Sequence, residues 1–258
     1  MYERELQKAI ALATQAGKRQ LTAQVQRRVF EIKADGSPVT TVDRECETLI
    51  REGLRSAFPE DGILGEEGGM QEGTSGRTWI VDPLDGTRPF IRGIPTYSCL
   101  IALEAVGEPV VGVIHLPALK ETCWASSGGG AFQNDRPLRV SNTRTLSEAM
   151  GSGLGQVERL DTPIGKQLLA TMHACDYAYG FMDNYTYACV AAGRLDFCIN
   201  LLDKVWDCAA AACIVSEAGG AYSDINGNKT IHGGSIIVSN GFLHEAILAA
   251  LAITDPPA

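Results

Sequence analysis

The 258-residue sequence has no apolar run long enough to span a bilayer. Its first residues, MYERELQKAIAL, carry charges at helical spacing and show no signal-peptide pattern. Basic residues are also scarce, because 22 Lys and Arg against 31 Asp and Glu give a net charge of -9. An acidic surface argues against nucleic acid or an anionic membrane as the main partner. We therefore expect a soluble cytoplasmic protein, whose substrate could still be a small anion met by local cations.

No pair among the eight cysteines has the Cys-x-x-Cys spacing, and several cysteines lie within apolar runs. This pattern is a poor match to a zinc site or a disulfide framework, so we expect reduced cysteines that act as small core residues. The four histidines are scattered without ligand spacing. They are typical of surface or ordinary packing residues.

Neither an internal repeat nor a low-complexity linker divides the chain, and its patterns mix helices with strands. Helical periodicity predicts helices over residues 3–28, 40–58, 163–174, 183–193, 206–220 and 242–252. Strands are predicted over residues 62–69, 78–83, 194–200 and 235–241, with an antiparallel meander between residues 95 and 140. Thr40 and Asp43 fit a capping box. The stretch EIKADGSPVTT is predicted as a loop or hairpin tip, and GGMQEGTSG as a surface loop.

This order of elements favours α+β layering over strict βαβ alternation. We expect a single domain over residues 1–258. A weak boundary near Ser141–Ala149 separates sub-layers of about residues 1–145 and 146–258.

Acidic residues recur at strand ends and helix starts: Glu66-Glu67, Asp82, Asp85 and Asp207. Any one of them alone is typical of a turn or a helix cap. If they converge, however, two charges about 5 Å apart repel by roughly 3 kcal/mol at an effective dielectric of 20. Converging carboxylates therefore imply bound cations or raised pKa values. A set of oxygen ligands favours Mg²⁺ or Mn²⁺ over Zn²⁺.

Gly86 and Thr87 follow the second of the two closely spaced acids. Glycine lets the backbone approach an anion, and N–H groups at a turn entering a helix can bind phosphate. Acids for metals beside amides for phosphate suggest metal-assisted hydrolysis of a phosphate ester.

Three motifs in order, GEEGG, WIVDPLDGTRPF and VWDCAAAACIVSEAGG, resemble the inositol-monophosphatase family of Mg²⁺-dependent, lithium-sensitive phosphatases. The resemblance covers essentially the whole chain. It implies a layered αβαβα fold of the sugar-phosphatase type, two or three Mg²⁺ ions with Mn²⁺ as a substitute, and a homodimer.

The resemblance also implies roles for individual residues. Metal would be bound by four carboxylates and one carbonyl: Glu66, Asp82, Asp85, Asp207 and the carbonyl of Leu84. Gly86 and Thr87 would offer backbone N–H groups to the phosphate. Water would be activated by Glu66 and by Thr87 paired with Asp43. Glu67 would be a nearby acid, and Lys33 would lie on a mobile loop that approaches the site.

The substrate is indicated by residues outside the metal motifs. The stretches DGTRPFIRGIPTYSCLIAL, which contains Arg88, and KADGSPVT look closer to the histidinol-phosphatase branch of the family. Asp183 matches a substrate-contacting position of that branch, with a helix N-cap as the equal alternative. Asn200 stands where many inositol phosphatases carry a Glu. We therefore expect histidinol phosphate as the substrate, with inositol monophosphate as the main alternative and other sugar or nucleotide phosphates behind.

Two other classes of protein are less well supported. A haloacid-dehalogenase-type phosphatase uses an Asp-x-Asp-Gly-Thr loop, but here Pro83 occupies the place of its first acid. A non-catalytic scaffold with a relict site is disfavoured because every expected ligand position carries an acid.

Overall fold

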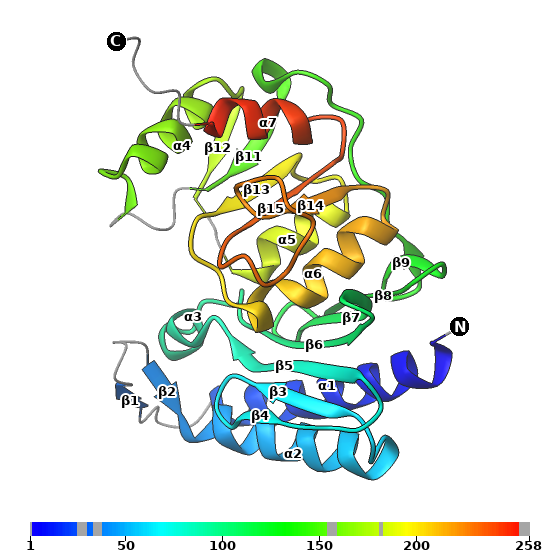
Figure 1. Cartoon of the computed structure of the whole chain (residues 1–258). Helices are drawn as coiled ribbons and strands as arrows, with labels where there is room; N and C mark the ends of the chain where they lie inside the picture. The colour runs from blue at the N-terminus through cyan, green and yellow to red at the C-terminus, as the bar shows by residue number, and fades with distance from the viewer. Residues whose placement is uncertain (1, 25–29, 33–37, 154–158, 181–182, 253–258) are drawn as a thin grey trace.

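The computed structural model describes residues 2–24, 30–32, 38–153, 159–180 and 183–252, and these form five alternating layers (Figure 1). The helices are α1 (Glu3–Gln24), α2 (Thr41–Ala57), α3 (Thr87–Arg92), α4 (Pro163–His173), α5 (Asn184–Ala191), α6 (Val205–Glu217) and α7 (His244–Leu251). From one side to the other, the layers are α1 with α2, a sheet, α5 with α6, a second sheet, and α4 with α7. The predicted αβαβα fold is confirmed.

The first sheet has eight strands in the order β10-β9-β8-β7-β6-β5-β3-β4. Their bounds are β3 (Gly62–Gly65), β4 (Gly69–Gln71), β5 (Arg77–Asp85), β6 (Ser98–Ala105), β7 (Glu108–Leu116), β8 (Glu121–Ser126), β9 (Gly130–Gln133) and β10 (Arg136–Pro137). Within this sheet, the described strands β3 and β5 pair in parallel, and the other neighbouring strands pair antiparallel. The predicted meander is confirmed as strands β6 to β10.

The outer face of this sheet is covered by α1 and α2, whose apolar residues recur at helical spacing and point inward. The predicted capping box of α2 is present, because the Thr40 hydroxyl accepts the Val42 N–H and the Asp43 carboxylate accepts the Thr40 N–H. Next to α2, β1 (Phe30–Ile32) and β2 (Pro38–Thr40) form a small antiparallel pair. The residues between these two strands, including Lys33, lie outside the described part of the chain.

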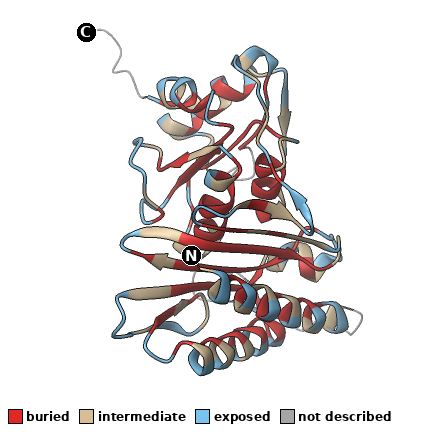
Figure 2. Cartoon of the chain, turned by 90° about the vertical axis from the view of Figure 1, so that its right-hand side faces the viewer, coloured by how far each residue is buried: buried red, intermediate tan, exposed pale blue. Residues whose placement is uncertain are grey.

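Much of the middle layer is buried, as are the central strands of the first sheet (Figure 2). Helix α6 is packed between both sheets, and its residues 208–215 are all buried. Small side chains make this possible: four consecutive alanines occupy positions 209–212. Strand β7 also contributes a glycine, since a Cβ on Gly112 would lie 2.5 Å from the Ala210 carbonyl oxygen.

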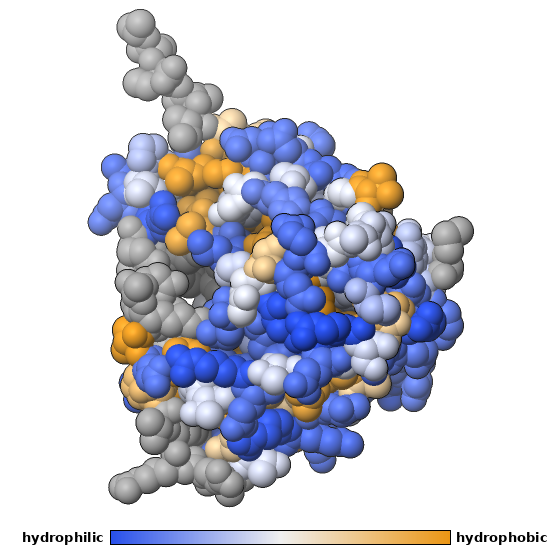
Figure 3. All heavy atoms as spheres, turned by 60° about the horizontal axis from the view of Figure 1, so that its bottom comes forward, coloured by the Kyte–Doolittle hydropathy of each residue, from blue (hydrophilic) through white to orange (hydrophobic). Residues whose placement is uncertain are grey.

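The second sheet has five strands in the order β12-β11-β13-β15-β14. They are β11 (Met150–Ser152), β12 (Tyr177–Tyr179), β13 (Phe197–Asn200), β14 (Ala221–Ser223) and β15 (Ile236–Ser239). This sheet therefore begins just after the boundary predicted near Ser141–Ala149. Among the described residues, no helix combines the length and apolarity that a membrane crossing needs. The face seen in Figure 3 is mostly hydrophilic, with its hydrophobic residues in small separate groups.

Two sequence expectations need correction. The segment GGMQEGTSG is not all loop, because Gly69–Gln71 forms β4 and pairs with β3 in a hairpin. Strands β11, β12 and β14 were not predicted, since three residues are too few to show an alternating pattern. The helix predicted over residues 3–28 extends through Gln24 in the structure, and residues 25–29 lie outside the described part.

Candidate active site

The structure brings together three of the predicted acids. Asp82 and Asp85 lie at the end of β5, and Asp207 lies in the first turn of α6. One carboxylate oxygen from each of the three side chains lies within 4.8 Å of the others. The site is therefore built where the first sheet meets the buried middle layer.

An irregularity in β5 explains how two acids three residues apart share one site. Asp82 pairs with Leu100 of β6, whereas Asp85 pairs with Ser98, so three steps on β5 oppose two steps on β6. In a regular strand, residues three apart point to opposite faces of the sheet. The extra residue is a bulge, and it turns Asp85 to the same side as Asp82.

The bulge is held from both sides. The Leu84 N–H donates to Oδ1 of Asp82 at 2.9 Å, which closes a tight turn around Pro83. From α1, the buried amide of Gln20 donates to the Pro83 carbonyl at 2.8 Å. Pro83 cannot donate a ladder hydrogen bond, so a bulge is a place where the sheet tolerates it.

The pKa values of all three acids are raised. For Asp82 the main cause is burial, followed by the charges of Glu66, Asp85 and Asp207. Burial, and then the charge of Asp183, raises the pKa of Asp85 to about 8. Burial raises the pKa of Asp207 to about 6, although its carboxylate accepts the Lys204 N–H at 3.0 Å. Each carboxyl group is therefore held in a place that disfavours its negative charge.

No lysine, arginine or histidine of the described residues forms an ion pair with Asp82, Asp85 or Asp207. The atoms that these three side chains offer to a metal are all carboxylate oxygens, which suit a hard divalent cation such as Mg²⁺. A bound cation would supply the missing positive charge. The residues present therefore fit the predicted metal.

Glu66, the fourth predicted carboxylate, follows directly after β3. Its N–H donates to the Val81 carbonyl at 3.1 Å, beside Asp82 in the neighbouring strand. Its charge contributes to the raised pKa of Asp82, of Asp207 and of Asp43. It is thus close enough to the three converging acids to act on them electrostatically, while its ligand role stays a prediction.

Thr87 and Asp43 meet as the sequence predicted. The Thr87 hydroxyl lies 3.2 Å from Oδ1 of Asp43 and 3.2 Å from the Leu84 carbonyl oxygen. Asp43 is fully buried at the start of α2, and this burial raises its pKa. Gly86 precedes α3 with φ of 77°, a left-handed conformation that favours glycine. The first N–H groups of a helix have no partner within the helix, so this turn can offer them to an anion.

Asp183 lies beside this turn. A Cβ on Gly86 would lie 3.6 Å from the Asp183 carboxyl carbon, and the Thr96 hydroxyl donates to Asp183 at 2.9 Å. Within the described residues, the Asp183 side chain makes no capping bond to α5. The alternative of a simple helix cap is therefore not supported by its geometry.

In the described part of the chain, the other predicted substrate residues are not among the three converging acids and their hydrogen-bond partners. Arg88 is exposed and lines a groove of about 650 Å³ between β1 and α3, together with Phe30, Ile32, Ile91 and Arg92. Asn200 is buried, and both ends of its side-chain amide bond to nearby groups of the protein. Lys33 lies outside the described residues.

Several residues that bond to the site acids or their neighbours carry little or no signal in the sequence. Asp203 is a further buried acid, held by the Tyr187 hydroxyl at 2.9 Å and the Asn200 amide at 2.9 Å. The Asn184 N–H donates to Asp85 at 3.0 Å, and its side chain donates to the Asp207 carbonyl at 2.8 Å. A signal was present for Asp203, which directly follows two leucines and stands only four residues before Asp207. Asn184 resembled an ordinary helix-start residue.

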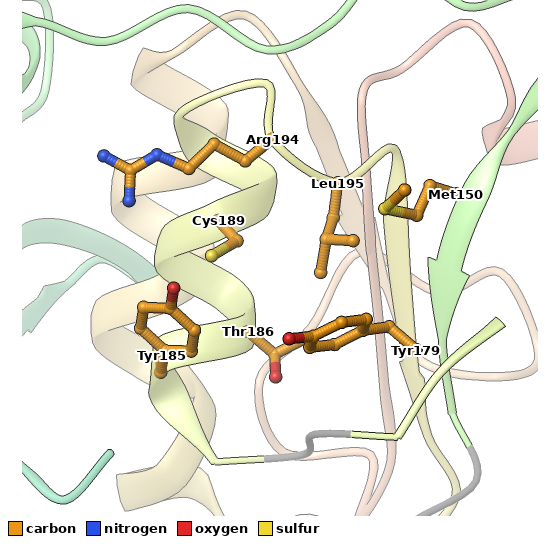
Figure 4. A pocket seen from close by; sticks show the side chains of 7 residues that line it. All are labelled: Met150, Tyr179, Tyr185, Thr186, Cys189, Arg194 and Leu195. Atoms are coloured by element: carbon orange, nitrogen blue, oxygen red, sulfur yellow. The ribbon is translucent and has the colours of Figure 1, made fainter. Parts of the chain in front are cut away.

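A separate pocket of about 180 Å³ opens beside α5 (Figure 4). It is lined by Met150, Tyr179, Tyr185, Thr186, Cys189, Arg194 and Leu195. This lining contains no carboxylate, so the pocket is distinct from the acidic cluster.

The fold and the acidic site together indicate a metal-dependent phosphatase class, and comparisons with known proteins agree. Residues 2–254 match the model of the inositol monophosphatase family. The histidinol-phosphatase of Chlorobaculum parvum is 40% identical in an alignment of 253 residues that covers 96% of this chain and 96% of its own. The inositol-1-monophosphatase of Rhizobium meliloti is 39% identical over 231 residues, covering 87% of this chain and 86% of its own.

A solved structure is similar over nearly the whole length. The crystal structure of extragenic suppressor protein suhB from Bartonella henselae has a TM-score of 0.88 at 33% identity, covering 96% of this chain and 98% of its own. The chain belongs to the inositol monophosphatase family. It is an enzyme of the phosphoric monoester hydrolase class, which is not compatible with a non-catalytic scaffold. Membership of the inositol monophosphatase family excludes the haloacid-dehalogenase alternative.

Proposed function

We propose that the protein is a Mg²⁺-dependent phosphomonoesterase that hydrolyses a small phosphate ester by attack of water. The observation that carries this proposal is the convergence of Asp82, Asp85 and Asp207 without a cationic partner among the described residues. Two or three ions would be held by these acids with Glu66 and the Leu84 carbonyl, and Mn²⁺ would substitute. When bound, the ions act as Lewis acids that polarise phosphoryl oxygens and lower the pKa of water.

Activation of the water and binding of the phosphate are the proposed roles of residues around the cluster. Glu66 would orient the attacking water and accept its proton. Asp43 accepts a hydrogen bond from the Thr87 hydroxyl, which fixes the direction of that hydroxyl and makes the pair a second group able to take a proton. The backbone N–H groups of Gly86 and Thr87 would bind the phosphate oxygens.

We propose L-histidinol phosphate as the preferred substrate. The relative from Chlorobaculum parvum that carries the name histidinol-phosphatase supports this choice. Asp183 supports it as well, because its carboxylate stands beside Gly86 and is suited to a substrate amine or hydroxyl. Arg88 and Asn200 are the other proposed substrate residues, and the inward-facing bonds of Asn200 favour a supporting role over direct contact.

Inositol monophosphate is the second candidate, since the relative from Rhizobium meliloti bears the name inositol-1-monophosphatase. A panel of phosphate esters assayed with Mg²⁺ separates the two, and it would include L-histidinol phosphate, inositol 1-phosphate, fructose 1,6-bisphosphate and a nucleoside monophosphate. We expect the highest kcat/KM with histidinol phosphate. A tenfold preference for inositol phosphate would refute this substrate, and no turnover of any ester would refute the phosphatase itself.

Asp183→Asn tests the contact with the substrate. The change keeps the size of the side chain and removes the charge that would pair with an amine. We expect KM for histidinol phosphate to rise at least tenfold, while KM for a phosphate ester without an amine changes little. Equal effects on both esters would place Asp183 outside the substrate contact.

The family resemblance also supports a cytoplasmic homodimer. Light scattering of the purified protein, in the presence and absence of Mg²⁺, would measure its mass in solution.

A further inference from the structure

Helix α2 carries a second buried acid one turn after Asp43. Glu47 has 3% of its surface exposed. Its carboxylate accepts three hydrogen bonds of 2.7 Å: from the Glu67 N–H, from the Gly68 N–H and from Nε of Arg51. A carboxylate that accepts charge-assisted and backbone bonds in this way is tightly fixed in position.

The two glycines that flank the acids of GEEGG are explained by this carboxylate. A Cβ on Gly65 would lie 2.4 Å from Oε1 of Glu47, and a Cβ on Gly68 would lie 2.6 Å from the same atom. Neither glycine has the left-handed backbone conformation that would by itself require glycine. Their missing side chains make room for Glu47.

The turn that carries Glu66 is thus held at several points. The Glu66 N–H bonds to β5, the next two N–H groups bond to Glu47, and the Gly69 carbonyl accepts from Arg51. The bonds from Glu47 and Arg51 come from one turn of α2. The same helix places Asp43 against Thr87.

We propose that Glu47, supported by Arg51, is a positioning residue that sets the place of Glu66 relative to the metal-binding acids. The inference rests on the proposed function, since it assumes that Glu66 binds metal. Asp43 and Glu47 lie four residues apart, so they share one face of α2. Because Asp43 contacts Thr87 and Glu47 contacts the Glu66 turn, the helix fixes the distance between the Glu66 turn and the Thr87 turn.

The test compares Glu47→Gln with Gly68→Ala. Glutamine has one acceptor oxygen in place of two, so it cannot receive all three donors. The alanine methyl group pushes the Glu47 carboxylate away while its charge is kept. For both variants we expect the Kd for Mg²⁺, measured by calorimetry without substrate, to rise about 10–100-fold, as happens when groups that orient a metal ligand are lost.

Kinetics give a second readout. In both variants the Mg²⁺ concentration for half-maximal activity should rise with the Kd, while KM for the ester at saturating Mg²⁺ stays within twofold. The matched control is Glu52→Gln, which removes the same charge from an exposed position on the same helix. Its Kd for Mg²⁺ should equal that of the unmodified protein.

A purely structural role would lower the melting temperature of both variants and leave their Kd for Mg²⁺ within twofold of the unmodified protein, and that result would overturn the inference. Should Glu47→Gln fail to fold, Gly68→Ala decides alone. The Kd for Mg²⁺ is measured without an ester. A protein that binds Mg²⁺ but hydrolyses no ester would therefore refute the proposed function while the positioning role was still decided by the two variants.

Discussion

Buried acids near the two ends of strand β5 differ in whether a basic side chain pairs with them. Near the start of the strand, Asp61 is 4% exposed and accepts two bonds from Arg77, one from the Trp79 indole and one from the Ser75 hydroxyl. Arg77 also bonds to Glu5 of α1 at 2.8 Å. At the far end, Asp82 and Asp85 face another acid and form no ion pair with a described basic residue.

The difference shows that burial alone does not identify a functional acid. A buried charge is tolerated when fixed donors replace its lost hydration, and the Asp61 end meets this condition within the protein. At the Asp82 end, hydrogen bonds replace only part of the lost hydration, because no described basic side chain pairs with the acids. A cluster of converging buried acids without a cationic partner therefore indicates a ligand, whereas a single buried acid paired with a cation indicates a structural role.

The largest expected effect comes from removing the cationic partner of Asp61. Arg77→Leu leaves Asp61 buried without its cation, which should lower the free energy of unfolding by about 3–5 kcal/mol. Urea unfolding at pH 7 measures this loss. Adding Asp61→Asn to the variant should recover part of it, because the unpaired charge is then gone. A loss below about 1 kcal/mol would mean that the ion pair is not what holds this end together.

The second largest effect is expected when Mg²⁺ binds to the acids at the Asp82 end of β5. Mg²⁺ at one hundred times its Kd should raise the free energy of unfolding by about 2.7 kcal/mol, because the ion binds only the folded chain. Thermal unfolding with Mg²⁺, and again after chelation, measures the shift. Sodium chloride at equal ionic strength is the control. An equal shift with sodium chloride would reduce the effect to charge screening.

A smaller effect of opposite sign to that of Arg77→Leu is expected from Asp85→Asn. This change removes one of the mutually repelling charges, so the metal-free protein should gain about 1–2 kcal/mol of stability at pH 8. Phosphatase activity should be lost and the stabilisation by Mg²⁺ should weaken. Unchanged activity would contradict the assignment of Asp85 as a metal ligand.

The smallest effect is the pH dependence of the metal-free protein. Asp85 has a pKa of about 8 and Asp207 of about 6 in the folded chain, both above the ordinary value for Asp, so the folded state binds more protons than the unfolded state. The resulting stability is full below about pH 4 and is lost as pH rises through about 6 and 8.

Urea unfolding of the metal-free protein at pH 5 and pH 8 tests this dependence. Subtracting the Asp85→Asn curve isolates Asp85, for which we expect a difference of about 1 kcal/mol or more. Parallel curves would show that Asp85 titrates at its ordinary pKa.

The sequence could predict the acids of the cluster because each stands at a strand end or a helix start within a distinctive motif. It could not predict how Asp82 and Asp85 come to face the same way, since a bulge depends on the pairing with β6. Glu47 was missed because an acid on an amphipathic helix normally faces solvent. Only the three-dimensional structure shows that Gly65 and Gly68 leave space for it.

Other parts of the site carried weak signals or none. Gln20 lies on the buried face of α1, and its bond to Pro83 depends on how α1 crosses the sheet. The short strand β4 has no apolar alternation, because it lies at the edge of the sheet and none of its residues is buried. Family resemblance supplied the roles of Glu66, Leu84 and Thr87, which residue types and spacing alone would have left open.

The position of α6 between the two sheets has a consequence for folding. Asp82 and Asp85 belong to the first sheet, but Asp207 reaches them only after α6 has packed against β6 and β7. A nascent chain that has formed the first sheet alone would therefore hold an incomplete set of carboxylates. Tight metal binding would then begin late in folding, after α6 has packed against the first sheet.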